Sequence, residues 1–139
     1  MFETFEHKAD IGVRGIGPTE GKAFEECAKA MFGVIADLKK VEAKKFDGIE
    51  LKAEDLEELL IKFLNELLFL KDAKGMLYSR FKVYITTEGS GFALHAKAGG
   101  EKIDTAKHSP RGDVKAATYH QLRVAKEGNR FVAQCVVDV

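Results

Sequence analysis

The sequence lacks several features that would each assign it to a class of protein. It has only two cysteines, Cys27 and Cys135, without CxxC spacing or a neighbouring histidine, which excludes a disulfide framework and predicts buried thiols in a reducing compartment. No apolar run approaches the roughly 20 residues of a membrane span. The first residues form neither the basic nor the apolar region of a signal peptide. We therefore expect a cytoplasmic protein without a membrane partner.

An excess of charge is also missing. Lys and Arg total 22 and Asp and Glu total 22, so the overall field does not attract nucleic acid or anionic lipid, although a local basic patch is compatible with this balance. Lys39, Lys40, Lys44 and Lys45 form one basic cluster. We interpret it as a solvated loop balanced by Glu42, not as an RNA contact. The composition thus gives no reason to expect direct nucleic-acid binding.

Motifs of the common enzyme classes are absent as well. The chain contains no HExxH, Walker or GxGxxG pattern and no recognisable Ser-His-Asp order. His7 and His120 are the candidates for acid–base chemistry. A single histidine in an alternating strand is more often structural than catalytic, so enzyme status has little direct support.

Two amphipathic helices are predicted within one domain covering residues 1–139. In the first, Thr19 is the N-cap, apolar residues recur at three- and four-residue steps from Glu20, and the helix ends near Ala36. The second opens with a capping box of Asp55 and Glu58, carries a broad leucine-rich face and stops at Gly75.

The remaining segments predict strands. The opening segment, 2–10, is too polar for a long buried strand, whereas period-two alternation covers 11–16, 46–53, 80–85, 92–98 and 131–137. The turn Glu88–Gly91 makes 80–98 a hairpin, and we interpret Gly99–Gly112 as a loop. This order predicts an α+β sandwich in which a mixed or antiparallel sheet is packed with the two amphipathic helices on one side.

The segment Gly112–Val124, GDVKAATYHQLRV, is the most unusual of these. It alternates with period two and is predicted to be a strand. Hydrogen-bonding side chains nevertheless occupy both of its faces, including Lys115, Thr118, Tyr119 and His120. An ordinary half-buried strand would confine them to one face.

Acidic residues occur near both ends of the chain. Asp138 is the penultimate residue of an apolar strand, and Asp10 precedes the strand 11–16. If the two ends pack together, their carboxylates and main-chain oxygens form a set of hard ligands suited to Ca²⁺, Mg²⁺ or Mn²⁺. The alternative is two solvated acids at strand ends.

Five segments carry a recognisable combination of motifs: HKAD at 7–10, residues 31–38, FLNELL at 63–68, GDVKAATYHQL at 112–122 and the closing VDV. Together they resemble the archease family. The resemblance runs over the whole chain in the family's order, and KAATYHQL, close to the family's KAVTYHQL, is its most specific part. Many members have HTAD and a closing LDI in place of HKAD and VDV. These differences leave both acids in place but bear on how strongly the protein binds its partner.

The resemblance implies a protein cofactor and not a free-standing enzyme. Archeases activate the tRNA-splicing RNA ligase, which joins 3′-phosphate or 2′,3′-cyclic phosphate ends to 5′-hydroxyl ends with GTP and Mn²⁺. They promote guanylylation of the ligase's active-site histidine and so allow multiple turnover. Two alternatives remain open: a chaperone-like adaptor of an RNA methyltransferase, and a small metal-dependent hydrolase.

The resemblance also implies a divalent-metal site. The family binds a divalent metal, Ca²⁺ in crystals, and the carry-over assigns it to Asp10, Asp138 and the main-chain or terminal oxygen of Val139, with Mg²⁺ or Mn²⁺ as alternatives. Supporting or partner-contacting residues would be His7, Asp37, Lys115, Tyr119 and His120. The sequence leaves open whether Asp37 or Asp113 joins the metal site.

Overall fold

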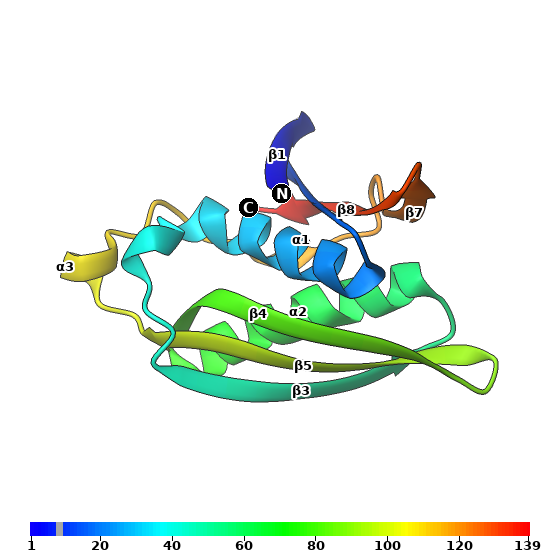
Figure 1. Ribbon diagram of the computed structural model, residues 1–139. Coiled ribbons are helices and arrows are strands. Elements are labelled where there is room, and N and C mark those ends of the chain that lie inside the picture. The colour runs from blue at the N-terminus through cyan, green and yellow to red at the C-terminus, as the bar shows by residue number, and fades with distance from the viewer. Residues whose placement is uncertain (8–9) are drawn as a thin grey trace.

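The strands form two antiparallel sheets in the computed structural model, which describes residues 1–7 and 10–139 and, of His7, the backbone alone (Figure 1). Sheet A has the order β1-β2-β8-β6, with β7 also paired to β8. Its strands are β1 (Phe2–His7), β2 (Asp10–Gly17), β6 (Ala116–Ala117), β7 (Arg123–Glu127) and β8 (Arg130–Asp138). Sheet B, in the order β3-β5-β4, consists of β3 (Lys45–Ala53), β4 (Met76–Glu88) and β5 (Gly91–Lys102).

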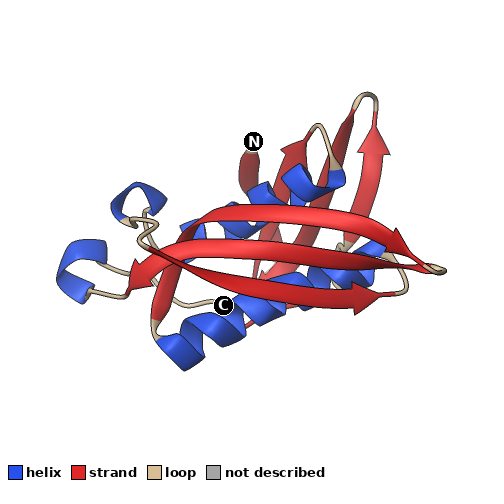
Figure 2. Ribbon diagram, turned by 60° about the horizontal axis from the view of Figure 1, so that its bottom comes forward, coloured by secondary structure: helices blue, strands red, loops and turns tan. Residues whose placement is uncertain are grey.

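The helices α1 (Glu20–Ile35) and α2 (Leu56–Lys74) lie between the sheets, as Figures 1 and 2 show from two sides. α1 packs against β2 and β4, and α2 packs against β3 and β6. The short helices η1 (Leu38–Lys40) and α3 (Thr105–His108) lie in connections. No helix of the described residues is both long and apolar enough to cross a membrane.

Local capping accounts for where the long helices begin and end. The Thr19 hydroxyl accepts a hydrogen bond from the Lys22 amide at 3.1 Å, and the Asp55 carboxylate accepts one from the Glu58 amide at 2.8 Å. Gly75 ends α2 in the left-handed conformation at φ 63°, which glycine adopts without a Cβ clash. Thr19 and Asp55 as N-caps and Gly75 as the stop are confirmed. Of the predicted capping box, the bond to Asp55 is present, whereas the Glu58 carboxylate pairs with Lys62 at 3.1 Å.

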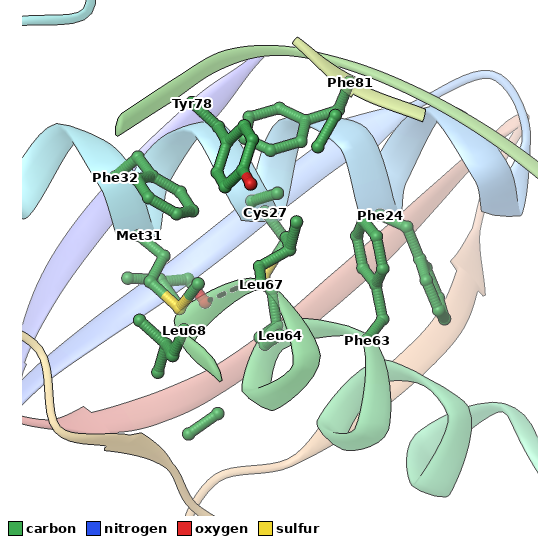
Figure 3. Packing of buried hydrophobic residues seen from close by; sticks show 14 of the residues in the cluster. Phe24, Cys27, Met31, Phe32, Phe63, Leu64, Leu67, Leu68, Tyr78 and Phe81 are labelled. Atoms are coloured by element: carbon green, nitrogen blue, oxygen red, sulfur yellow. Dashed lines mark hydrogen bonds between the residues drawn. The ribbon is translucent and has the colours of Figure 1, made fainter. Parts of the chain in front are cut away.

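The core is formed where the facing sides of α1 and α2 meet both sheets (Figure 3). Phe24 of α1 stacks on Phe63 of α2 with ring centroids 6.2 Å apart, and Phe32 makes an edge-to-face contact with Tyr78 of β4 at 5.7 Å. Close packing of α1 on sheet A also depends on Gly15 of β2. A Cβ there would lie 2.0 Å from the Ala23 carbonyl oxygen, so only glycine allows this approach.

The predicted α+β class is confirmed, with a difference in layering. Sheet B covers one side of the helices and sheet A covers the other, whereas one sheet with helices on one side was expected. The polar segment at the start of the chain contributes to this difference, because it forms an additional strand of sheet A: β1 pairs with β2 from Phe2 to His7. As an edge strand it tolerates the polar side chains that argued against a long buried strand.

The prediction of one strand over Gly112–Val124 is wrong. Ala116–Ala117 and Arg123–Glu127 pair separately with β8, and the chain turns between them. The Thr118 hydroxyl accepts a hydrogen bond from the His120 amide at 3.2 Å, and Gln121 adopts φ 54°. Such local side-chain bonds compete with the sheet ladder, which explains why the polar residues occupied both faces of the apparent strand.

The prediction that Gly99–Gly112 is all loop is also wrong. β5 continues to Lys102, and α3 follows after Asp104 caps its first amides. His108 at the end of α3 is buried, with its Nδ1 accepting a hydrogen bond from the Asp104 amide at 2.9 Å. Two consecutive glycines concealed the end of the strand from pattern reading.

Candidate acidic site at the edge of sheet A

Strand register aligns the two acids that the sequence singled out. β2 and β8 are antiparallel, with Ile11 opposite Val137, so continuing the register by one residue sets Asp10 opposite Asp138. The row extends on both sides, because His7 of β1 is opposite Asp10 and Ala116 of β6 is opposite Asp138. We call these four positions the acidic row. Directly opposed residues of antiparallel strands have Cα atoms about 4.5–5.5 Å apart.

Both acids point to the outer face of sheet A. Along β8, Ala133, Cys135 and Val137 belong to the core, so Asp138 follows on the opposite face. The same alternation in β2 places Val13 in the core and Asp10 outside. Asp10 is half-buried and Asp138 is exposed. Two carboxylates therefore share one solvent-accessible face at the end of adjacent strands.

Backbone hydrogen bonds hold the end of β8 in place. The Lys115 amide donates to the carbonyl oxygen of Asp138 at 2.7 Å, and the Thr118 amide donates to that of Val136 at 3.0 Å. Asn65 of α2 supports the same segment, because its side chain accepts from the Ala117 amide at 2.9 Å and donates to the Ala117 carbonyl at 3.2 Å. These bonds fix the position of the strand end that carries Asp138.

Tyr119 and His120 lie on the opposite side of β8 from Asp10. The Val136 amide donates to the His120 carbonyl at 2.9 Å, which places the loop two residues, or about 7 Å along the strand, from Asp138. Both side chains are exposed, and Tyr119 is 70% exposed. Together with exposed Lys115, they border the acidic row with groups that a partner can contact.

The structure gives Asp37 and Asp113 separate roles. Asp37 caps η1 by accepting from the Lys39 amide at 3.1 Å. Asp113 accepts from Lys71 at 2.8 Å, and this hydrogen bond lowers the pKa of its carboxyl group although partial burial opposes the shift. Arg111, two residues earlier, donates to the Gly33 carbonyl at 2.6 Å and so ties the loop that contains Asp113 to α1.

The donor chemistry of the acidic row fits a hard divalent cation. Opposed like charges on neighbouring strands repel each other, and a cation between them relieves that repulsion. Carboxylate and main-chain oxygens suit Ca²⁺, Mg²⁺ or Mn²⁺, which retain water at the remaining positions. Within residues 1–7 and 10–139, no group of three His, Cys, Asp or Glu side chains forms a metal site. The predicted ligands of a cation here are Asp10, Asp138, the main-chain or terminal oxygen of Val139, and water.

The cysteines of the chain are unsuited to nucleophilic chemistry. Cys27 and Cys135 are free and buried in the core, as predicted. Burial raises the pKa of Cys135 to about 12 and raises that of Cys27 as well. Because the thiolate is the reactive form, both thiols are inert in the native protein.

Sequence reasoning missed two polar side chains that hold connecting segments in place: half-buried Asn65, which supports the acidic row, and buried Glu101 of β5, which lies away from it. Asn65 sits in the apolar face of its helix, and that interruption was the available signal. Glu101 gave no signal, yet it accepts from the Glu42 amide at 2.7 Å and from Lys107 at 2.8 Å, and it bonds His108 Nε2 at 3.1 Å. These bonds, Lys107 first, hold the pKa of Glu101 well below its ordinary value. The basic cluster is correspondingly balanced in part by Glu101, which pairs with Lys44 at 3.3 Å.

Fold and site together define a small α+β protein whose two chain ends present an acidic, cation-compatible edge. The family model described as "Archease protein family (MTH1598/TM1083)" matches residues 2–139. "Protein archease" of Pyrococcus furiosus is 45% identical over 140 residues, covering 100% of this chain and 99% of that protein. "Protein archease" of Methanopyrus kandleri is 38% identical over 138 residues, covering 99% of each chain.

A solved structure agrees with these sequence matches. The solution structure of Methanobacterium thermoautotrophicum protein 1598 superposes with a TM-score of 0.88 at 36% sequence identity. The superposition covers 99% of this chain and 98% of that one. The chain belongs to the archease family.

Proposed function

We propose that this protein is an accessory factor that activates the tRNA-splicing RNA ligase in the cytoplasm. It promotes the GTP-dependent guanylylation of the ligase's active-site histidine and thereby allows repeated joining of 3′-phosphate or 2′,3′-cyclic phosphate ends to 5′-hydroxyl ends. Membership of the archease family supports this role. The observation that carries it is the acidic row, in which Asp10 and Asp138 share an exposed face on strands anchored in the core.

The residues of the acidic row are suited to work at the surface of a partner. Asp10 and Asp138 extend from adjacent strands and so keep a constant spacing. A divalent cation, Ca²⁺ or alternatively Mg²⁺ or Mn²⁺, would supply positive charge toward a nucleotide phosphate when bound. Exposed Lys115, Tyr119 and His120 border the row and would contact the ligase, while Asn65 keeps their segment in place.

Covalent labelling of the ligase with radioactive GMP tests the proposal under multiple turnover, with this protein at substoichiometric concentration. Wild-type protein is expected to increase labelling, and Asp138→Asn is expected to abolish the increase because it removes one carboxylate of the acidic row. Glu54→Gln is the matched control. Glu54 is exposed between β3 and α2, has no ion pair within the described chain, and its substitution removes the same charge.

The outcomes separate the alternatives. Stimulation by wild type and Glu54→Gln but not by Asp138→Asn supports the activator role and assigns it to the acidic row. No stimulation by any of the three rejects it, and the adaptor of an RNA methyltransferase is then tested by whether this protein keeps the methyltransferase soluble. Phosphatase or nuclease activity of the isolated protein that Asp138→Asn removes would identify a hydrolase instead.

A further inference from the structure

The outer face of sheet B is uncovered, as Figure 2 shows with this sheet in front of the helices. Register sets its outward residues in rows across β3, β5 and β4. Successive rows are Phe46-Gly99-Arg80, Gly48-Lys97-Lys82, Glu50-His95-Tyr84 and Lys52-Ala93-Thr86. The acidic row lies on the other sheet, so this face is a separate surface.

Unpaired cations are concentrated at one end of this face. Lys82 is directly opposite Lys97, and Arg80 precedes Lys82 by one row. None of the three forms an ion pair with any described residue, whereas Glu50 lies 3.3 Å from His95 and Glu88 is 2.6 Å from Lys52 farther along the sheet. Like charges opposed across antiparallel strands are destabilising, and a bound anion offsets that cost.

Two aromatic side chains are exposed among these cations. Phe46 is 49% exposed and Tyr84 is 60% exposed. A Cβ at Gly99 would lie 2.5 Å from Cε1 of Phe46, so the Phe46 ring is close to the sheet surface at that glycine. Gly48 has no atom within 4 Å of its Cβ position and leaves a gap in the face. A depression of about 710 Å³ lies here, with Lys82 and Lys97 on one side and Tyr84, His95 and Glu50 on the other.

This combination selects the ligand by its chemistry. Cations that neutralise phosphates, interleaved with exposed aromatic rings on an open sheet, match a strand whose bases are unstacked and free to pack on a side chain. A duplex offers phosphates but keeps its base faces covered, so the aromatic rings would contribute nothing to binding it. The net charge of the chain does not report on this surface, because the two acids on it, Glu50 and Glu88, contact His95 and Lys52 and leave the three cations without an acidic neighbour among the described residues.

We propose that the outer face of sheet B binds single-stranded nucleic acid, with Arg80, Lys82 and Lys97 on the phosphates and Phe46 and Tyr84 stacking on bases. This inference goes beyond ligase activation and does not rest on it, because it concerns binding by the isolated protein.

Fluorescence anisotropy with a labelled 12-nucleotide single-stranded RNA tests the proposal. Tyr84→Ala is expected to weaken binding about 5- to 150-fold, the range for loss of one stacked base. Lys82→Gln is expected to reduce the slope of log K against log salt concentration by about 0.7, the value for one phosphate contact on a single strand. Phe69→Ala on α2 and Lys126→Gln on β7 are the matched controls, since both residues are exposed away from sheet B.

Thermal unfolding keeps a folding defect distinct from a binding defect. Lys82→Gln removes one of two opposed cations, so its Tm is expected to equal or exceed that of wild type while binding weakens. Equal affinity for the single strand and for a duplex of the same sequence would overturn the stacking role. The proposal would be overturned if the wild-type protein did not bind the RNA. It would also be overturned if Tyr84→Ala and Lys82→Gln both bound it with wild-type affinity. If these variants instead lose only their association with the ligase, the face is a protein interface.

Discussion

The side chain of Asn65 offers the sharpest test of how the fold supports the acidic row. It bridges α2 to the amide and the carbonyl of Ala117, at 2.9 and 3.2 Å. Ala117 is only 6% exposed, so Asn65→Ala leaves both of these groups with little access to water. Two such groups cost about 2–6 kcal/mol of unfolding free energy when each loses its partner. An unfolding entropy of about 2.1 cal/mol/K per residue converts that cost into a fall in Tm of roughly 7–21 °C.

Urea unfolding and amide hydrogen exchange measure the two sides of this expectation. Asn65→Ala should lower the unfolding free energy and increase exchange at the Ala117 amide. Asn129→Ala, in the exposed turn between β7 and β8, is the control and should stay within about 0.5 kcal/mol of wild type. An unfolding free energy of Asn65→Ala that is also within that margin, or unchanged protection of Ala117, would refute the reasoning.

Asn65→Asp separates the two hydrogen bonds. The carboxylate still accepts from the Ala117 amide, but it sets a second oxygen against the Ala117 carbonyl where an amide donor stood. We expect this variant to be destabilised near neutral pH and to approach wild-type stability as acidification protonates the carboxyl group and restores a donor. A deficit that does not shrink on acidification would show that the bond to the carbonyl carries little of the stability. Ligase stimulation should also fall with Asn65→Ala at temperatures where the variant is folded. The reason is that Asn65 holds the segment whose Lys115 amide donates to the Asp138 carbonyl.

Two further expectations concern buried groups away from the acidic row. The pKa of Glu101 is held below its ordinary value, chiefly by Lys107 and further by His108, so the stability it contributes is complete above the carboxyl's ordinary pKa and is lost as the pH falls below it. Glu101→Gln should therefore flatten the dependence of Tm on pH between about 5 and 2, measured by calorimetry, and an unchanged slope would contradict this assignment. Because burial raises the pKa values of Cys27 and Cys135, iodoacetamide at pH 8 should modify neither in the native protein and both in urea, as read by mass spectrometry; native modification would show that the core opens.

Short-range signals were reliable where a side chain acts on its own neighbourhood. Thr19, Asp55 and Gly75 act within three or four residues of themselves, so the helix boundaries followed from sequence. Reasoning from the local pattern failed at Gly112–Val124. Alternation is typical of a strand, but it does not show that a neighbouring strand pairs with the whole segment. There the Thr118 hydroxyl and Asn65, the latter 52 residues from Ala117, hold the backbone that a ladder would otherwise hold.

The acidic row shows the same difference between what the local sequence predicts and what strand pairing decides. Residue types identified Asp10 and Asp138 as hard-oxygen ligands and indicated the family, but their proximity depends on a register between strands 128 positions apart. The register follows from packing: β2 and β8 both place apolar residues on α1, and a shift of one residue would turn those side chains to solvent. The structure also decided the role of Asp37, which caps η1.

By itself, the sequence determined the helices with their caps, the β4–β5 hairpin, the buried thiols and the family, because each depends on local periodicity, composition or a contiguous motif. Only the tertiary structure decided that the strands divide into two sheets around the helices, that the acids face each other, and that Lys82, Lys97 and Tyr84 gather on an open face. Those features depend on which strands pair and in what register. That choice is made by burying the whole apolar core at once, and no single segment of the chain encodes it.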